Sequence, residues 1–308
     1  MSSHAGELAA LTTGLLWAFT SVMFTLAGRR IPLTALNLLR TGLAAIFLAL
    51  TLWLATGSPW PASAPTPRIF DLALSGLIGL AIGDNLLFHG YQWIGPRLSS
   101  LLMTLVPPIS ATIAWIHLGE RLDPADLTGM ALVLGGVVWV IAERRSPAPA
   151  TPHLAGGPHG PSRHRTLGVL CGIGAAISQS VGAIFAKQGM AAIDPLPATL
   201  IRMVTAFGVL AVALLVTGRT PAIFAPLKSR RVLALTLSAS LLGPYLGVWL
   251  SLVGLHRTAA GVALTLMAMT PIFVIPVSRY ALGEQPTRRA IAGTILAVAG
   301  VALLLRPA

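Results

Sequence analysis

The stretch GDNLLFHGY, residues 83–91, places an acid, an amide and an imidazole within a run of residues that is otherwise apolar. Asp84 can bind and release a proton, and Asn85 and His89 can donate and accept hydrogen bonds. A charged group at the centre of a bilayer costs about 2.5 to 3.5 kcal/mol on insertion scales, so Asp84 is not expected to face lipid. The stretch therefore predicts a water-accessible cavity with a role in ligand or proton binding, and the alternatives are a structural ion pair with a partner such as Arg40 or a position at the membrane interface.

Further side chains that could bind a small ligand lie in other apolar runs. Pro107 and Pro271 interrupt the helical hydrogen-bond ladder, and freed carbonyl groups at membrane depth are tolerated only against protein or a wet cavity. Met103 and Met267 precede them by about one turn and offer polarizable surface, although Met also fills packing gaps. Trp and Tyr also form interfacial belts, which is the alternative for the aromatic candidates. The predicted substrate-binding residues are Trp17, Ser21, Asp84, Asn85, Met103, Gln179, Tyr245, Trp249 and Met267.

Four charged residues are expected to have structural roles. Arg40 and Arg202 occupy matching places in two apolar runs, where an arginine can extend to the interface or bond the carbonyl ends of neighbouring helices. Glu120 and Glu284 directly follow two other runs, beside basic residues such as Arg121. Exposed ion pairs of that kind contribute under about 1 kcal/mol, so we predict boundary contacts rather than substrate ligands.

Neither a metal site nor enzymatic chemistry is favoured by the residue pattern. His153, His159 and His164 lie in a Pro- and Gly-rich stretch whose spacing fixes no ligand geometry. The sequence contains neither an H-E-x-x-H zinc motif nor a G-x-S-x-G nucleophile elbow. Only Asp84 lies well inside an apolar run, so an aspartyl dyad is not expected. We predict no enzyme, no cofactor and no bound metal.

The composition is that of an integral membrane protein. The 308 residues are 55% hydrophobic and 10% charged, whereas a soluble domain has about 25% charged residues. Apolar runs of about 20 residues match the length that crosses a hydrocarbon core, and in lipid only helices satisfy the backbone of such runs. The predicted fold is all-α with ten transmembrane helices, at 7–27, 32–55, 69–92, 98–118, 124–142, 166–187, 195–216, 231–254, 258–281 and 287–305.

The net charge of +12 does not indicate a nucleic-acid partner. The 21 Lys and Arg residues lie mostly in short connections between apolar runs and form no continuous basic face. Such residues set the topology and contact anionic lipid headgroups. The expected partners are therefore membrane lipid and a small-molecule substrate, with protons as an open addition, and a monomer suffices.

The two halves of the sequence are related by duplication. Shifting residues 98–141 forward by 164 positions gives ten identities in 44 positions, and Arg40 matches Arg202 at a shift of 162. We therefore predict a first repeat at 1–142, a Pro-, Gly-, His- and Arg-rich linker at 143–165 and a second repeat at 166–308. Five spans in each repeat would give the second repeat the opposite membrane orientation, an inverted arrangement that is characteristic of secondary transporters.

The same residues resemble a known family. The pattern GYQWIGPRLSSLLMTLVPPISATIAWIHLGERL, followed by LTGMALVLGGVVW, has the counterpart GLHRTAAGVALTLMAMTPIFVIPVSRYALGEQP, followed by IAGTILAVAGVALL. Both resemble the paired EamA domains of the drug/metabolite transporter superfamily, although Gln285 follows the second LGE where Arg121 follows the first. The resemblance implies a ten-helix exporter or exchanger and names no ligand.

We therefore predict a secondary transporter that works by alternating access in the plasma (inner) membrane. The candidate lining combines aromatic residues and Met with few charges, which favours a partly apolar metabolite such as an amino acid over a sugar phosphate. An uncoupled facilitator or a channel fits the same sequence, and an intramembrane enzyme is the alternative from another class. The orientation stays open, because the distribution of Lys and Arg places both termini outside whereas the family is usually drawn with both in the cytoplasm.

Overall fold

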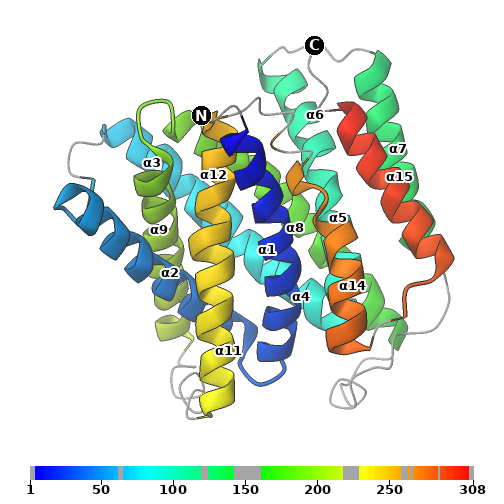
Figure 1. Ribbon diagram of the computed structural model, residues 1–308, viewed down its shortest axis with the longest axis horizontal. Helices are drawn as coiled ribbons and strands as arrows, with labels where there is room; N and C mark the ends of the chain where they lie inside the picture. The colour runs from blue at the N-terminus through cyan, green and yellow to red at the C-terminus, as the bar shows by residue number, and fades with distance from the viewer. Residues whose placement is uncertain are drawn as a thin grey trace.

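The described part of the chain is helical almost throughout (Figure 1). The computed structural model describes residues 4–61, 65–118, 124–141, 161–217, 229–257, 263, 266–283 and 285–304. The first half contains α1 (Ala5–Ala27), α2 (Leu33–Thr56), α3 (Thr66–Ser75), η1 (Gly76–Gly83), α4 (Asp84–Trp93), α5 (Gly95–Leu102), η2 (Met103–Leu105), α6 (Val106–Leu118) and α7 (Pro124–Ile141).

The second half repeats this order of elements. It contains α8 (Pro161–Gly189), α9 (Pro195–Val216), α11 (Arg230–Ser240), η4 (Leu241–Gly247), α12 (Val248–Arg257), α14 (Thr270–Leu282) and α15 (Arg288–Leu304). Both η1 and η4 are π-helical turns in the third long helix of their half. Wide turns of this kind occur often at functional sites.

Six helices in the described residues are long and apolar enough to cross a membrane. They are Ala5–Ala27, Leu33–Thr56, Thr66–Trp93, His164–Gly189, Pro195–Val216 and Val232–Arg257. The described parts of the other predicted spans are shorter: η2 separates α5 from α6, α14 begins at Thr270, and α7 and α15 have 18 and 17 residues. The described residues thus form the helices of a multi-pass membrane protein, and they contain six of the ten predicted spans at full length.

The two halves pack crosswise. The first helix of the first half, α1, contacts η4, α12 and α14 of the second half, and α8 in the same way contacts η1, α4 and α6 of the first half. Helix α2 packs on α9, and α7 packs on α15 (Figure 1). Equivalent helices therefore meet as pairs, and each half completes the core of the other.

Glycines allow α7 and α15 to approach closely. A Cβ atom on Gly136 would lie 2.6 Å from the carbonyl oxygen of Gly293, and one on Gly300 would lie 2.7 Å from the carbonyl oxygen of Gly129. Contact moves towards the end of one helix as it moves towards the start of the other, so these two equivalent helices run antiparallel. Gly136 and Gly300 match at the duplication shift of 164, as do Gly129 and Gly293.

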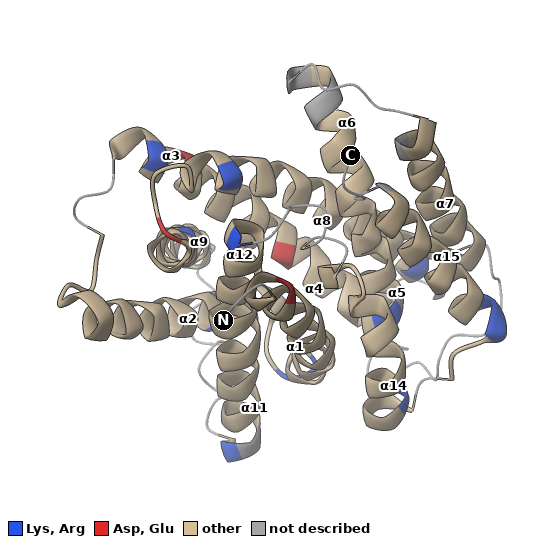
Figure 2. Cartoon of the chain, turned by 45° about the horizontal axis from the view of Figure 1, so that its top comes forward, with Lys and Arg blue, Asp and Glu red and all other residues tan. Residues whose placement is uncertain are grey.

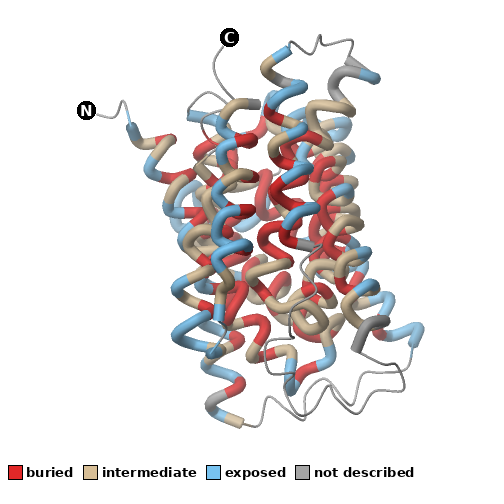
Figure 3. Tube along the Cα trace, turned by 90° about the vertical axis from the view of Figure 1, so that its right-hand side faces the viewer, coloured by how far each residue is buried: buried red, intermediate tan, exposed pale blue. Residues whose placement is uncertain are grey.

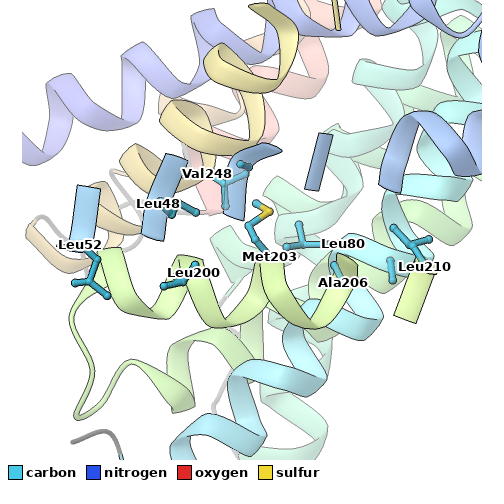
Figure 4. Packing of buried hydrophobic residues seen from close by; sticks show 10 residues of the cluster. Leu48, Leu52, Leu80, Leu200, Met203, Ala206, Leu210 and Val248 are labelled. Atoms are coloured by element: carbon cyan, nitrogen blue, oxygen red, sulfur yellow. The ribbon is translucent and has the colours of Figure 1, made fainter. Parts of the chain in front are cut away.

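Buried and exposed positions are arranged as expected for a membrane protein. The buried residues form the inside of the bundle (Figure 3), for example where Leu48 of α2, Leu80 of η1 and Met203 of α9 meet (Figure 4). Large apolar side chains such as Leu54 and Val216 are exposed at 75% and 81%, as lipid-facing residues are. Charged residues are few along the helices (Figure 2).

Candidate functional site

The π-helical turn η1 turns backbone carbonyl groups towards neighbouring helices. The backbone N–H of Asp84 bonds back to the carbonyl oxygen of Gly79, the wide pattern of a π turn. Gln179 of α8 also donates to the Gly79 oxygen, at 3.2 Å, and Asn37 of α2 donates to the Leu80 oxygen at 3.0 Å. Side chains from both halves thus hold the turn from which Asp84 projects.

Asp84 is the centre of a buried polar cluster. Its Oδ2 atom accepts a hydrogen bond from the guanidinium of Arg40, with which Asp84 forms an ion pair. Its Oδ1 atom accepts a hydrogen bond of 2.9 Å from Gln179 Nε2. Arg40 Nε donates to Asn37 Oδ1 at 2.8 Å. Asp84 and Arg40 are exposed at only 6% and 5%. Both carboxylate oxygens are therefore bonded, and the buried negative charge is balanced by one arginine.

Aromatic rings cover the same arginine. The Arg40 guanidinium carbon lies 4.9 Å from the ring centre of Phe88 and 5.6 Å from that of Phe24. A cation above a ring face is attracted by the ring quadrupole, more strongly where water is excluded. Arg40 is thus fixed on one side by Asp84 and Asn37 and on the other by two phenyl rings.

Arg202 differs from Arg40 in having no such partners. It is exposed at only 6%, and its Nε atom is buried without a hydrogen-bond partner. Within the described residues its side chain donates no hydrogen bond and forms no ion pair. A Cβ built on Gly79 would lie 3.8 Å from Arg202 Nη2, so the guanidinium lies beside η1. The cluster of Arg40, Asp84 and Arg202 therefore carries one excess positive charge.

A cavity of about 240 Å³ opens beside this cluster, between the two halves. From the first half it is lined by Trp17, Thr20, Phe24, Arg40, Leu80, Asp84, Leu87, Phe88, Tyr91, Ser100, Met103, Thr104, Val106 and Pro107. From the second half it is lined by Gln179, Ala183, Ala186, Arg202, Gly243, Val248, Ser251, Leu252, Leu255, Met267, Ala268, Thr270 and Pro271. The lining is apolar on most sides, with charge concentrated at one place.

The cavity gathers most of the residues predicted to bind substrate, although their role in binding stays a prediction. Met103 lies in η2, four residues before Pro107, and Met267 lies four residues before Pro271, which is in the first turn of α14. Both prolines are thus near helix starts, where a missing N–H is tolerated. The predicted residues that line the cavity are Trp17, Asp84, Met103, Gln179, Met267, Pro107 and Pro271.

Two other predicted residues form hydrogen bonds to backbone carbonyl groups of their own helical segments. Ser21 is buried, and its hydroxyl donates to the carbonyl oxygen of Ala18 at 2.8 Å. Asn85 donates to the carbonyl oxygen of Ala81 at 2.7 Å. Neither residue belongs to the cavity lining, because adjacent positions on a helix point about 100° apart and Asp84 takes the inward direction.

The aromatic pair Tyr245 and Trp249 also lies away from the cavity lining. The Tyr245 hydroxyl forms a hydrogen bond of 2.9 Å with Thr51 of α2, and the ring centres of Tyr245 and Trp249 are 5.9 Å apart. Both pack against the apolar cluster between α2 and α9. Their contacts are those of packing between helices.

The residues predicted to be structural have different outcomes. Arg40 forms the predicted pair with Asp84 and yet lines the cavity, so the two settings predicted for Asp84 coexist. Arg202 lines the cavity without a partner, which its match to Arg40 did not indicate. Glu120 and Glu284 lie outside the described residues.

Sequence reasoning missed several hydroxyl residues of the lining. Ser100, Thr104, Ser251 and Thr270 all line the cavity. Thr270 immediately precedes Pro271, and its hydroxyl contacts the carbonyl oxygens of Met267 and Gly14, at 2.7 and 3.2 Å. For Thr270 the neighbouring proline was the available signal, whereas Ser100, Thr104 and Ser251 have no adjacent proline.

Comparisons with known proteins agree with this architecture. A model of the EamA-like transporter family matches residues 4–142 and 166–306. A solved structure described only as the crystal structure of a protein shares the fold, with a TM-score of 0.68 at 17% identity over 98% of this chain and 96% of the other. No curated protein matches. Because the family model covers both halves, the chain belongs to the EamA-like transporter family.

Proposed function

We propose that the protein is a secondary transporter that exports or exchanges a small metabolite by alternating access, with the cavity between its halves as the binding site. The observation that carries this proposal is the cavity of about 240 Å³, lined by both halves and containing a buried charged cluster. Ionisable groups inside a membrane protein mark substrate or ion pathways. No enzymatic activity is proposed for a member of a transporter family.

We further propose ten membrane crossings arranged as two inverted five-helix repeats in the plasma membrane. The antiparallel contact between the equivalent helices α7 and α15 supports the inversion, as does the crosswise packing of α1 and α8. In this arrangement the site lies at the interface between the repeats, and rocking one repeat against the other exposes it to one side at a time.

Two forms of energy coupling are compatible with the cluster. Asp84 would serve as a proton site if its pair with Arg40 opened during the cycle. If the pair stays closed, the protein works as an exchanger or as a facilitator driven by the gradient of its substrate. No other acid occurs among the lining residues that the structure describes, which makes Asp84 the residue to test.

The test is uptake and efflux of a panel of amino acids, nucleosides and organic acids by proteoliposomes, with and without a pH gradient. We expect at least one solute to move faster than in protein-free liposomes. In Asp84→Asn, proton coupling predicts loss of the response to the pH gradient with transport retained. Asp71→Asn is the matched control, because Asp71 lies in the more exposed pair with Arg68 at 3.6 Å.

Two outcomes would count against parts of the proposal. If no solute moves in either direction through folded, reconstituted protein, the transporter function is wrong. If a folded Asp84→Asn protein keeps both transport and pH response, Asp84 has a structural role only.

A further inference from the structure

The duplication makes it possible to compare the polar cluster with its counterpart in the second half. Gly79 and Gly83 of η1 match Gly243 and Gly247 of η4 at the shift of 164, so Asp84 matches Val248. At the shift of 162, Arg40 matches Arg202 and Trp17 matches Gln179. The cavity is lined by all six of these matched residues: Trp17, Arg40, Asp84, Gln179, Arg202 and Val248.

The two half-sites have opposite chemistry. In the first, Arg40 and Gln179 both bond Asp84. In the second, Val248 stands where the acid would be and Trp17 where the amide would be, so Arg202 has no anionic counterpart of its own. The cavity is therefore bounded by one charged cluster beside η1, in which Asp84 and Arg40 form a neutral ion pair and the Arg202 guanidinium adds an uncompensated positive charge.

A buried guanidinium without an anionic partner lowers the stability of the protein unless a ligand supplies the missing negative charge and hydrogen-bond acceptors. Burial of an ion has a desolvation penalty, and an unpaired buried donor adds to it. Arg202 is 94% buried, lines the cavity and has an unpartnered Nε. A guanidinium presents a planar fork of donors that matches a carboxylate.

Building on the proposed function, we propose that Arg202 binds the carboxylate of the transported solute, and that this solute is an organic monocarboxylate with an apolar body. The apolar body would lie against Trp17, Val248 and Met267, which line the same cavity. One unpaired cation balances one negative charge, so a sugar phosphate, with about two charges, is not matched.

The same cluster argues against a zwitterion. Among the described residues that line the cavity, Asp84 is the only acid, and both of its oxygens already accept bonds from Arg40 and Gln179. An ammonium group on the solute would find no free carboxylate, whereas a simple carboxylic acid needs none. The preferred solute is thus a monocarboxylate rather than the amino acid that composition alone favoured.

The test compares ligands of one shape and different charge. The full chain in lipid nanodiscs is titrated by calorimetry with 3-phenylpropionate, its neutral amide 3-phenylpropanamide, phenylalanine and acetate. We expect 3-phenylpropionate to bind at least about tenfold more tightly than its amide, since a hydrogen bond to a charged group is worth roughly a 10- to 100-fold change in affinity. It should also bind more tightly than acetate, which lacks the apolar body, and than phenylalanine, whose ammonium group finds no free carboxylate. In Arg202→Gln the preference for the acid over the amide disappears, while binding of the amide is unchanged.

Two further variants separate charge from geometry. Arg202→Lys keeps the charge without the planar fork and should retain part of the preference for the carboxylate. Arg68→Gln is the matched control and should bind as the wild type does, since Arg68 lies outside the cavity and contacts Asp71 and the carbonyl oxygen of Gln188. If Arg202→Gln does not fold, Arg202→Lys and the comparison of ligands on the wild-type protein still test whether Arg202 binds the carboxylate.

The outcomes are distinct from those of the proposed function. Equal affinity for the acid and the amide, or wild-type affinity of Arg202→Gln for the acid, overturns the inference. If acetate binds as tightly as 3-phenylpropionate, the claim that the solute has an apolar body is wrong. If phenylalanine binds more tightly than 3-phenylpropionate, the claim that the solute is a monocarboxylate is wrong. Transport of neutral solutes alone overturns the inference and leaves the transporter standing. If 3-phenylpropionate binds in an Arg202-dependent way but no solute is transported, the inference stands for binding and the transporter function is wrong.

Discussion

Asp84 and Arg40 show how a buried charge persists in an apolar bundle. Removing one partner of a buried ion pair leaves the other charge uncompensated, which typically costs about 3 to 5 kcal/mol. The pair is exposed at only 5 to 6% and is held further by Asn37 and Gln179. The pair therefore contributes to the stability of the bundle as well as to the charge of the cavity.

We predict that Asp84→Asn lowers the free energy of unfolding by about 3 to 5 kcal/mol, because the Arg40 charge loses its partner. Thermal unfolding in detergent, followed by tryptophan fluorescence, measures this. Asp71→Asn, which removes the more exposed pair with Arg68, should change stability by less than about 1 kcal/mol. Equal effects of the two substitutions would show that the buried pair contributes no more than the surface one.

Tyr245 provides the opposite case, a polar residue used for packing. Tyr245→Phe removes the hydrogen bond of 2.9 Å to Thr51 and should cost about 1 kcal/mol of stability. Because Tyr245 lies outside the cavity lining, the affinity for 3-phenylpropionate should stay at the wild-type value. A large loss of affinity at unchanged stability would place Tyr245 in the binding site after all.

At the scale of elements, the contact between α7 and α15 depends on glycines at specific positions. Gly136→Ala would put a Cβ 2.6 Å from the carbonyl oxygen of Gly293, and overpacking of this kind costs about 1 to 3 kcal/mol. The neighbouring Gly135→Ala meets no atom within 4 Å and should be neutral or stabilise by up to about 1 kcal/mol through helix propensity. Thermal unfolding of the two variants side by side is the measurement, and equal stability would contradict this packing.

The sequence predicts the helices much better than their internal irregularities. Apolar runs and prolines place most helices to within a few residues, and the interruptions near Pro107 and Pro271 are found as η2 and the start of α14. The π turns η1 and η4 were not predicted, because glycine-rich apolar runs such as GLIGLAIG do not distinguish a π turn from a regular helix. The turn in η1 decides that Asp84, and not Asn85, faces the cavity.

Helix rotation also explains which site residues could be found. The chemistry of Asp84, Gln179 and the two Met residues was sufficient to select them, since polar or polarizable groups in apolar runs need a reason. Ser21 and Tyr245 have the same character, yet their directions depend on contacts with other helices such as the bond to Thr51. Spacing along one helix contains no information about those contacts.

At the scale of the whole molecule, duplication and crosswise packing together create the site. The first helix of each half packs against helices of the other half. The cavity therefore lies between the halves and is lined by residues of both. Val248 stands at the position equivalent to Asp84, so the two halves differ in charge there. We infer that the repeats supply the movement, whereas the difference between them supplies the specificity.

The most direct test of this account asks whether the cavity opens to both sides of the membrane. Ser100 lines the cavity, whereas its neighbour Ser99 is fully buried outside the lining. In a Cys171→Ala background, which removes the one native cysteine, Ser100→Cys and Ser99→Cys are treated with a membrane-impermeant thiol reagent added to either side of proteoliposomes.

Alternating access predicts that Cys at position 100 reacts from each side, that 3-phenylpropionate slows the reaction, and that Cys at position 99 stays unlabelled. Reaction of position 100 from one side only under all conditions, or equal reaction at both positions, would contradict the claim that this cavity is the transport site.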